Sequence, residues 1–301
     1  MPSKKKILIV GGTGFIGFHL ARKCLDLKWS VTSLSTSYPR KNRKLKKVSY
    51  KICDISNFNL LTKKIKPNFD YVVNLAGYVD HTNRSKTMRS HYVGCKNLST
   101  LFLNSKIKKF VQIGSSIEYG RVKSPQTESN LNNKAFSIYG TAKLLSTQFL
   151  QDLFKKLNFP ATILRLYLVY GPNQDANRVV PITIINAMKD KTFDCSNGLQ
   201  LRDFTYVDDV INAIIMSLKN PKSTGEIINI GSGKPVSVKK VIAKICALLN
   251  SGKPQYGKIK LRKDEIMKLY PNINKARKIL NWKPSISLEK GLRKTIQFFN
   301  K

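Results

Sequence analysis

The chain has 301 residues, 42% of them hydrophobic and 9% aromatic, which is typical of a soluble globular protein with one large α/β core or a core and a smaller lobe. Its 54 Lys and Arg against 17 Asp and Glu give a formal net charge of +37. The sequence has no helix-turn-helix, zinc-finger or base-stacking motif, so we interpret this excess as solvated surface and expect no specific nucleic-acid partner. No apolar segment approaches the ~20 residues needed to span a membrane, which excludes a membrane protein. The sequence has no secretory signal, and its cysteines lack metal-ligand spacing. These features predict a cytoplasmic protein with free thiols.

The first predicted element is a buried strand over residues 7–10, which breaks at two glycines before a helical pattern begins at Phe15. Glycines at this spacing let a diphosphate approach the backbone, and the N-terminus of the next helix supplies N–H groups and a positive dipole end. A tight strand–helix connection without a ligand is the alternative. We interpret the turn as a nucleotide-binding site formed by Gly11, Thr13, Gly14, Phe15, Ile16 and Gly17.

The second predicted strand covers residues 30–34. A carboxylate at the end of this strand would bind the ribose 2′-OH of a dinucleotide. Here the strand is followed by hydroxyl groups and then by basic groups, which suits a 2′-phosphate better than a bare ribose. We therefore favour NADP(H), with Ser35, Thr36 and Arg40 as ligands, and keep NAD(H) and an ordinary basic loop as alternatives.

Three further strands are expected over residues 47–52, 70–77 and 109–113, with a helix at about 92–104. Because strands and helices alternate at this spacing, we predict an α/β fold with a Rossmann-type, doubly wound parallel sheet. The residues after the third and fourth strands are expected to border the cofactor, with Asp54 and Ile55 near the adenine and Leu75, Ala76 and Gly77 beneath it.

Another buried strand covers residues 161–166. From residue 171 onward the pattern becomes mixed and is interrupted by Gly and Pro. We therefore predict an NAD(P)-binding domain over residues 1–170 and a smaller substrate-binding lobe over residues 171–301. Residues 225–231 still resemble a core strand and are expected to return to the sheet, so the two parts interleave.

A candidate catalytic group lies beyond the strand at 109–113. Ser115 follows the carboxyl end of that strand, where ligands bind in open α/β sheets. Tyr139 and Lys143 share one face of a predicted helix, and an ammonium beside a phenol lowers the phenol pKa from its usual ~10. The tyrosine could then exchange protons near neutral pH while the serine holds the substrate oxygen. A surface aromatic–lysine pair is the alternative, but the series of motifs favours catalysis.

These motifs together resemble the extended short-chain dehydrogenase/reductases of the nucleotide-sugar epimerase/dehydratase/reductase family, over nearly the whole chain. The resemblance also rests on residues 93–97, 170–172, 202–209, 229–233 and 280–284. It implies that Tyr139 is the acid/base, that Lys143 is its electrostatic partner and binds the nicotinamide ribose, and that Ser115 polarises the substrate oxygen.

The resemblance further implies a nucleotide-sugar substrate and a homodimer. Arg202 and Arg262 match family arginines that face the substrate diphosphate, although either could instead belong to an ion pair. The full set of expected substrate-binding residues is Ser116, Tyr119, Arg202, Arg262 and Asp264.

Two departures from the family pattern narrow the reaction. Family dehydratases need an Asp-Glu pair where this chain has Ser116 and Ile117, and family epimerases usually have Asn where it has Leu168. We therefore expect 4-ketoreduction of a nucleotide-linked 4-keto-6-deoxy sugar, with Tyr139 as proton donor. A 4-epimerase with tightly held NAD and a non-catalytic basic binding module are the alternatives. The three histidines predict no metal site.

Overall fold

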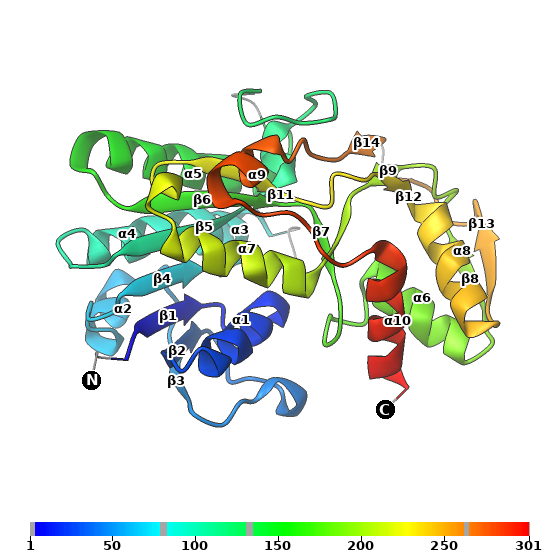
Figure 1. Cartoon of the computed structure of the whole chain (residues 1–301), viewed down its shortest axis with the longest axis horizontal. Coiled ribbons are helices and arrows are strands. Elements are labelled where there is room, and N and C mark those ends of the chain that lie inside the picture. Colours follow the sequence, from blue (N-terminus) through cyan, green and yellow to red (C-terminus); the bar gives the residue numbers. More distant parts are fainter. Residues whose placement is uncertain (1–3, 79–82, 131–134, 262–264, 301) are drawn as a thin grey trace.

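The computed structural model describes residues 4–78, 83–130, 135–261 and 265–300. At its centre is a seven-stranded sheet in the order β11-β6-β5-β4-β1-β2-β3, in which every neighbouring pair is parallel (Figure 1). The strands are β1 (Lys6–Val10), β2 (Ser30–Ser35), β3 (Val48–Ile52), β4 (Tyr71–Asn74), β5 (Lys109–Ser115), β6 (Ala161–Leu166) and β11 (Ile227–Ile230). The predicted doubly wound α/β fold is confirmed.

Helices cover both faces of this sheet because the side chains of its strands alternate between two apolar cores. In β1, Ile7 and Ile9 belong to one core, and Leu8 and Val10 belong to the other. Helices α1 and α7 pack together on the first face, and α4 contacts both α2 and α5 on the second. The helices of the sheet are α1 (Phe15–Asp26), α2 (Phe58–Lys64), α3 (Arg84–Met88), α4 (Gly94–Phe102), α5 (Ile138–Leu157), α7 (Val207–Lys219) and α9 (Asn274–Leu280).

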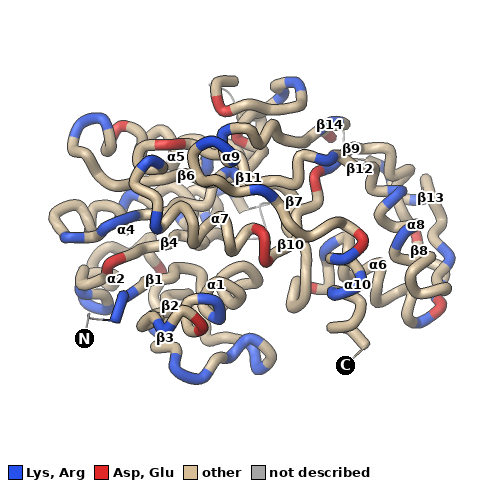
Figure 2. The backbone as a smooth tube through the Cα atoms, viewed as in Figure 1, with Lys and Arg blue, Asp and Glu red and all other residues tan. Residues whose placement is uncertain are grey.

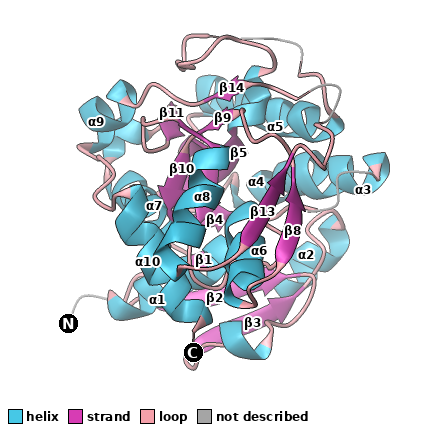
Figure 3. Cartoon of the chain, turned by 90° about the vertical axis from the view of Figure 1, so that its right-hand side faces the viewer, coloured by secondary structure: helices cyan, strands magenta, loops and turns pink. Residues whose placement is uncertain are grey.

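The remaining helices gather at one end of the sheet, on the right in Figure 1. They are α6 (Val179–Met188), α8 (Val238–Leu249) and α10 (Leu288–Phe299), and they pack against one another. A parallel pair, β8 (Thr192–Cys195) and β13 (Lys253–Tyr256), lies beside them, as Figure 3 shows from the side. Five short strands complete this part of the chain: β7 (Leu168–Tyr170), β9 (Leu201–Arg202), β10 (Phe204–Tyr206), β12 (Val236–Ser237) and β14 (Lys268–Leu269).

The chain returns from this end to the sheet through β11, which pairs in parallel with β6. The expected return of the segment 225–231 is therefore observed, whereas the domain boundary at residues 170 and 171 stays a prediction. Figure 2 shows Lys and Arg along both the sheet region and the group of helices beside it. Within the described residues, no helix combines the length and the apolar character needed to cross a membrane.

Candidate active site

The glycine turn between β1 and α1 is closely packed. Gly11 has φ +79°, and a Cβ there would lie 2.9 Å from the backbone carbonyl of Leu75. A Cβ on Gly17 would lie 2.3 Å from the carbonyl oxygen of Gly11, so a side chain would separate the turn from the helix. At the N-cap Gly14, no side chain of the described residues caps the first turn of α1. Its N–H groups are therefore available to a phosphate, and the turn fits a dinucleotide.

The end of β2 holds the turn through a hydroxyl group. Ser35 Oγ accepts a hydrogen bond of 3.3 Å from the backbone N–H of Thr13, while Thr36 is exposed. The two nearby arginines both bind Asp175: Arg40 at 3.0 Å and the buried Arg43 at 2.7 Å. Arg40, the basic group predicted to bind a 2′-phosphate, is therefore already paired with a carboxylate in this structure, and it shares this single negative charge with Arg43.

The segments after β3 and β4 lie where the parallel sheet directs them. Asp54 is exposed, and its Oδ1 accepts the N–H of Ser56 at 2.8 Å. Ile55 is buried against Gly94, where an added Cβ would lie 2.7 Å from the isoleucine side chain.

Residues 75–77 continue directly from β4. Leu75 N–H donates to the carbonyl of Val10 at 2.9 Å, and Ala76 N–H donates to Asn74 Oδ1 at 3.1 Å. Gly77 is exposed. These bonds fix the backbone beside the glycine turn, and a Cβ on Gly11 would contact the same segment.

The three predicted catalytic residues come together at the carboxyl end of β5. Ser115 ends that strand and is the N-cap of the 3-10 helix η3 (Ser116–Tyr119), with its Oγ accepting the N–H of Ile117 at 3.4 Å. Tyr139, in the first turn of α5, lies close enough to Ser115 for the serine hydroxyl to lower the pKa of its phenol. Lys143 follows one turn later, and its Nζ lies 6.0 Å from the centre of the Tyr139 ring.

The pKa of Tyr139 differs from the expectation of a lowered value. Burial raises the pKa of this phenol, its hydrogen bond with Ser115 lowers it, and the negative charge of Glu118 raises it. The Nζ of Lys143, 6.0 Å from the centre of the phenol ring, donates at 2.6 Å to the backbone carbonyl of Ile113. Burial lowers the pKa of Lys143 to about 8. In this structure, Tyr139 is therefore a protonated phenol at neutral pH.

A family model for the NAD dependent epimerase/dehydratase family matches residues 7–231 of this chain. The chain belongs to this family. The resemblance seen in the sequence is thus confirmed, and the protein is an enzyme of the NAD-dependent epimerase/dehydratase type.

Individual relatives match almost the entire chain. A UDP-N-acetyl-alpha-D-glucosaminuronate decarboxylase of Bacillus cytotoxicus is 29% identical over 98% of both chains. The solved UDP-glucose 4-epimerase of Thermotoga maritima, with UDP-glucose, is 25% identical over 98% of both chains with a TM-score of 0.90. The UDP-glucuronic acid 4-epimerase of Bacillus cereus, solved with UDP-glucuronic acid and NAD, is 26% identical, covers 98% of this chain and 99% of its own, and has a TM-score of 0.87.

The expected substrate-binding residues of this family member lie in different surroundings. Ser116 is buried next to Ser115. Tyr119 is 1% exposed, and its hydroxyl donates to Asn229 Oδ1 at 2.8 Å, so this side chain is engaged inside the protein. Arg202 is buried and binds the carboxylate of Glu265, which is the ion-pair alternative stated for it. Arg262 and Asp264 lie outside the described residues.

Two contacts with the predicted catalytic residues were not expected from the sequence. The His91 ring packs edge-on against Tyr139, with ring centres 5.0 Å apart and an interplanar angle of 67°. A Cβ on Gly77 would lie 2.0 Å from this histidine ring, which explains the glycine. Glu118 binds the backbone N–H of Ser115 at 2.7 Å. The sequence signal that could have indicated the contact of His91 is its position just before residues 93–97, which belong to the family resemblance.

Proposed function

We propose that this enzyme reduces the 4-keto group of a nucleotide-linked 4-keto-6-deoxy sugar. The observation that carries the proposal is the meeting of Ser115, Tyr139 and Lys143 at the carboxyl end of β5, with a phenol whose pKa is raised. A protonated phenol is a proton donor, as reduction of a carbonyl requires. The nucleotide sugar is proposed because the similar proteins named above carry UDP-sugars in their names or were solved with them.

In this reaction, a bound nicotinamide cofactor supplies the hydride. Tyr139 donates its phenolic proton to the oxygen of the keto carbon. Ser115 donates a hydrogen bond to the same oxygen and stabilises the negative charge that develops there. Lys143 keeps the first turns of α5 against β5 through Ile113 and is proposed to bind the ribose of the cofactor. The backbone N–H groups at the start of α1 bind the diphosphate.

Residues beside Ser115 favour reduction over dehydration. The positions that carry an Asp-Glu pair in family dehydratases hold Ser116 and Ile117, and neither side chain can transfer the proton needed to eliminate water. Leu168, which replaces an epimerase asparagine, is 40% exposed and presents an apolar surface instead of an amide. All three residues support a reaction that ends at the alcohol.

A 4-epimerase is the second candidate. The two solved proteins named above are both 4-epimerases, and the enzyme of Bacillus cereus was solved with NAD. An epimerase would oxidise and then re-reduce the same carbon while retaining the cofactor. Tyr139 would then have to accept a proton before it returns one, and its raised pKa works against that first step.

NADP(H) is proposed as the cofactor because the end of β2 offers Ser35 and Thr36 and no carboxylate. Asp175 disfavours NADP(H) binding, because its carboxylate already pairs with Arg40. NADP(H) binding therefore requires Arg40 to exchange a carboxylate for a phosphate. Mass spectrometry of the dinucleotide released from the purified protein reports the presence of the 2′-phosphate directly.

The proposed reaction is tested by NADPH consumption with nucleotide-linked 4-keto-6-deoxy sugars. Tyr139→Phe should abolish turnover and leave cofactor affinity close to that of the wild type, whereas the control Tyr256→Phe should keep both. Equal loss of turnover and binding would show that Tyr139 is structural. Stoichiometric bound NAD, with sugar interconversion and no NADPH consumption, would establish the epimerase instead.

A further inference from the structure

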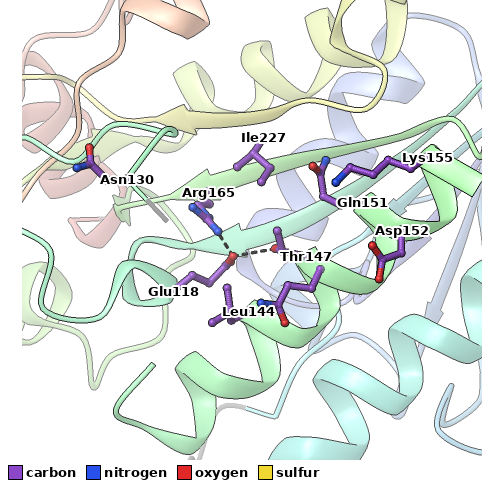
Figure 4. Close-up of a pocket in the computed structure, with 10 residues that line it drawn as sticks. Glu118, Asn130, Leu144, Thr147, Gln151, Asp152, Lys155, Arg165 and Ile227 are labelled. Carbon is purple, nitrogen blue, oxygen red and sulfur yellow. Dashed lines mark hydrogen bonds and ion pairs between the residues drawn. The ribbon is translucent and has the colours of Figure 1, made fainter. Parts of the chain in front are cut away.

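The carboxylate of Glu118 lies at the meeting point of three elements that build the catalytic group. Its side chain belongs to η3 and is 1% exposed. Oε1 accepts the backbone N–H of Ser115, at the end of β5, at 2.7 Å. Oε2 accepts both Thr147 Oγ1 from α5, at 2.7 Å, and Arg165 Nε from β6, at 2.9 Å. Figure 4 shows Arg165 and Thr147 converging on this one carboxylate.

The contact with Ser115 fixes the conformation of the catalytic serine. Ser115 and Glu118 form a reciprocal capping box, in which the serine side chain accepts a backbone N–H of η3 and the glutamate accepts the serine N–H. Gly114, just before Ser115, packs against the same carboxylate, because an added Cβ would lie 2.6 Å from Oε1. The backbone on both sides of the Ser115 nitrogen is thus held by Glu118.

The contact with Thr147 extends this restraint to the helix of Tyr139. Thr147 lies about two helical turns after Tyr139 on α5. Since one carboxylate binds both Ser115 and α5, the distance between the serine and tyrosine side chains depends on the position of Glu118.

Arg165 prevents the carboxylate from turning away. Its guanidinium lies 4.4 Å from the centre of the Tyr119 ring. The Tyr119 hydroxyl is itself bonded to Asn229 in β11 at 2.8 Å. Glu118, Thr147 and Arg165 also line a cavity of about 390 Å³, whose other residues on α5 include Gln151 and Lys155 (Figure 4).

We propose that Glu118 is a positioning residue for the catalytic group, holding Ser115 at a fixed distance from Tyr139 on α5. This inference rests on the proposed function, because it gives a role in the same site to a side chain that does not touch the substrate. Misplacement of a reacting group by about 1 Å can lower a rate by roughly 100-fold, so a restraint of this kind affects turnover strongly.

The charge of Glu118 acts on the same group. It raises the pKa of Tyr139 and works in the same direction on Lys143, whose pKa burial lowers to about 8. Among the described residues, the charged and titratable groups that face this region include Arg165 from β6, Tyr119 from η3, Lys143 and Tyr139 from α5, His91 just before α4, Cys95 from α4, and Arg178 before α6.

Glu118→Gln tests the proposal, because it keeps an oxygen that can accept the Ser115 N–H and removes the charge. We expect kcat to fall while KM for the nucleotide sugar stays near the wild-type value, and we expect Tyr139 to titrate at lower pH. Glu118→Ala removes the restraint as well and should lower kcat by roughly 100-fold. The Tyr139 titration is measured by NMR with tyrosine labelled at Cζ, using Tyr139→Phe for assignment.

Asp209→Asn is the matched control. Asp209 is another buried carboxylate, which binds the segment at Ser285 and Ile286, so its loss tests general destabilisation. If Glu118→Ala behaves like this control, with the kcat of the folded protein and the Tyr139 titration unchanged, Glu118 is only structural. Glu118→Gln combined with Arg165→Met avoids an unpaired buried guanidinium if the single variant does not fold.

The titration also separates the two proposals. If the wild type turns over no nucleotide sugar, the proposed function fails. If the pKa of Tyr139 is lower in Glu118→Gln than in the wild type, the charge of Glu118 still raises the pKa of this tyrosine. An unchanged titration and kcat in an active enzyme would overturn the Glu118 proposal alone.

Discussion

Lys143 Nζ donates a hydrogen bond of 2.6 Å to the backbone carbonyl of Ile113 and so joins the first turns of α5 to β5. The lysine is buried, and this burial lowers its pKa to about 8. The positive charge proposed to bind the nicotinamide ribose is therefore lost as the pH rises only slightly above neutral.

Cofactor affinity should consequently fall as the pH rises through about 8. Fluorescence titration with NADPH over a pH series measures this effect. Lys143→Gln should bind more weakly and without that pH dependence. Lys109→Met is the matched control, because Lys109 is also buried with a pKa of about 8 but starts β5, at the end away from Ser115. The same pH dependence in Lys143→Gln as in the wild type would contradict the assignment.

Lys109 makes a separate prediction about stability. Its folded pKa of about 8 lies below the value of ~10.4 for an exposed lysine, so the unfolded chain binds more protons between these two pH values. The free energy of unfolding should therefore rise with pH across this window, by on the order of 3 kcal/mol, relative to Lys109→Met. Below pH 8 Lys109 is protonated in both the folded and the unfolded chain, so the free energy that its burial costs does not change with pH. Urea unfolding of both proteins at several pH values measures the difference, and a difference independent of pH would refute the prediction.

Asp175 should limit the preference for NADP(H), because it pairs with Arg40 and Arg43. Asp175→Asn frees both guanidinium groups and should tighten NADPH binding without a matching gain for NADH. Arg40→Ala should weaken NADPH binding by roughly tenfold, because it removes a hydrogen bond to a charged group. The affinity for NADH should stay unchanged. Calorimetric titration with both dinucleotides checks each variant. Parallel changes for NADH and NADPH would show that Arg40 does not bind a 2′-phosphate.

Glu265 should compete with the substrate diphosphate for Arg202, because its carboxylate binds this guanidinium in the structure. With UDP as the probe, Glu265→Gln should bind more tightly than the wild type. Arg202→Gln should bind roughly ten- to a hundredfold more weakly. Calorimetry gives both affinities. If Glu265→Gln weakens UDP binding, the ion pair supports the site instead of competing for it.

The features predicted correctly from the sequence depend on short stretches of chain. The glycine turn needs only residues 11–17, and each buried strand shows its own apolar run. Ser115 and Tyr139 could be placed near each other because Ser115 ends β5 and Tyr139 begins the next long helix, which starts at the carboxyl edge of the sheet. Alternation of elements is sufficient to predict that arrangement without any measured distance.

The features that were missed depend on partners far apart in the chain. Glu118 and Arg165 are 47 residues apart, Arg43 and Asp175 are 132 apart, and Arg202 and Glu265 are 63 apart. No local pattern specifies which arginine meets which carboxylate. The predicted lowering of the Tyr139 pKa was also wrong. The four-residue spacing places Lys143 on the same helix face as Tyr139, but it does not show that the Lys143 ammonium donates to the carbonyl of Ile113.

The place of β11 in the sheet has a consequence for synthesis on the ribosome. β6 gains its outer neighbour only after Ile230 has emerged, because β11 completes that side of the sheet. Throughout the translation of residues 167–226, the outer backbone groups of β6 lack their final pairing strand and can pair with a neighbouring nascent chain. Slow translation of that stretch should therefore favour aggregation, and faster codons there should increase the yield of folded protein.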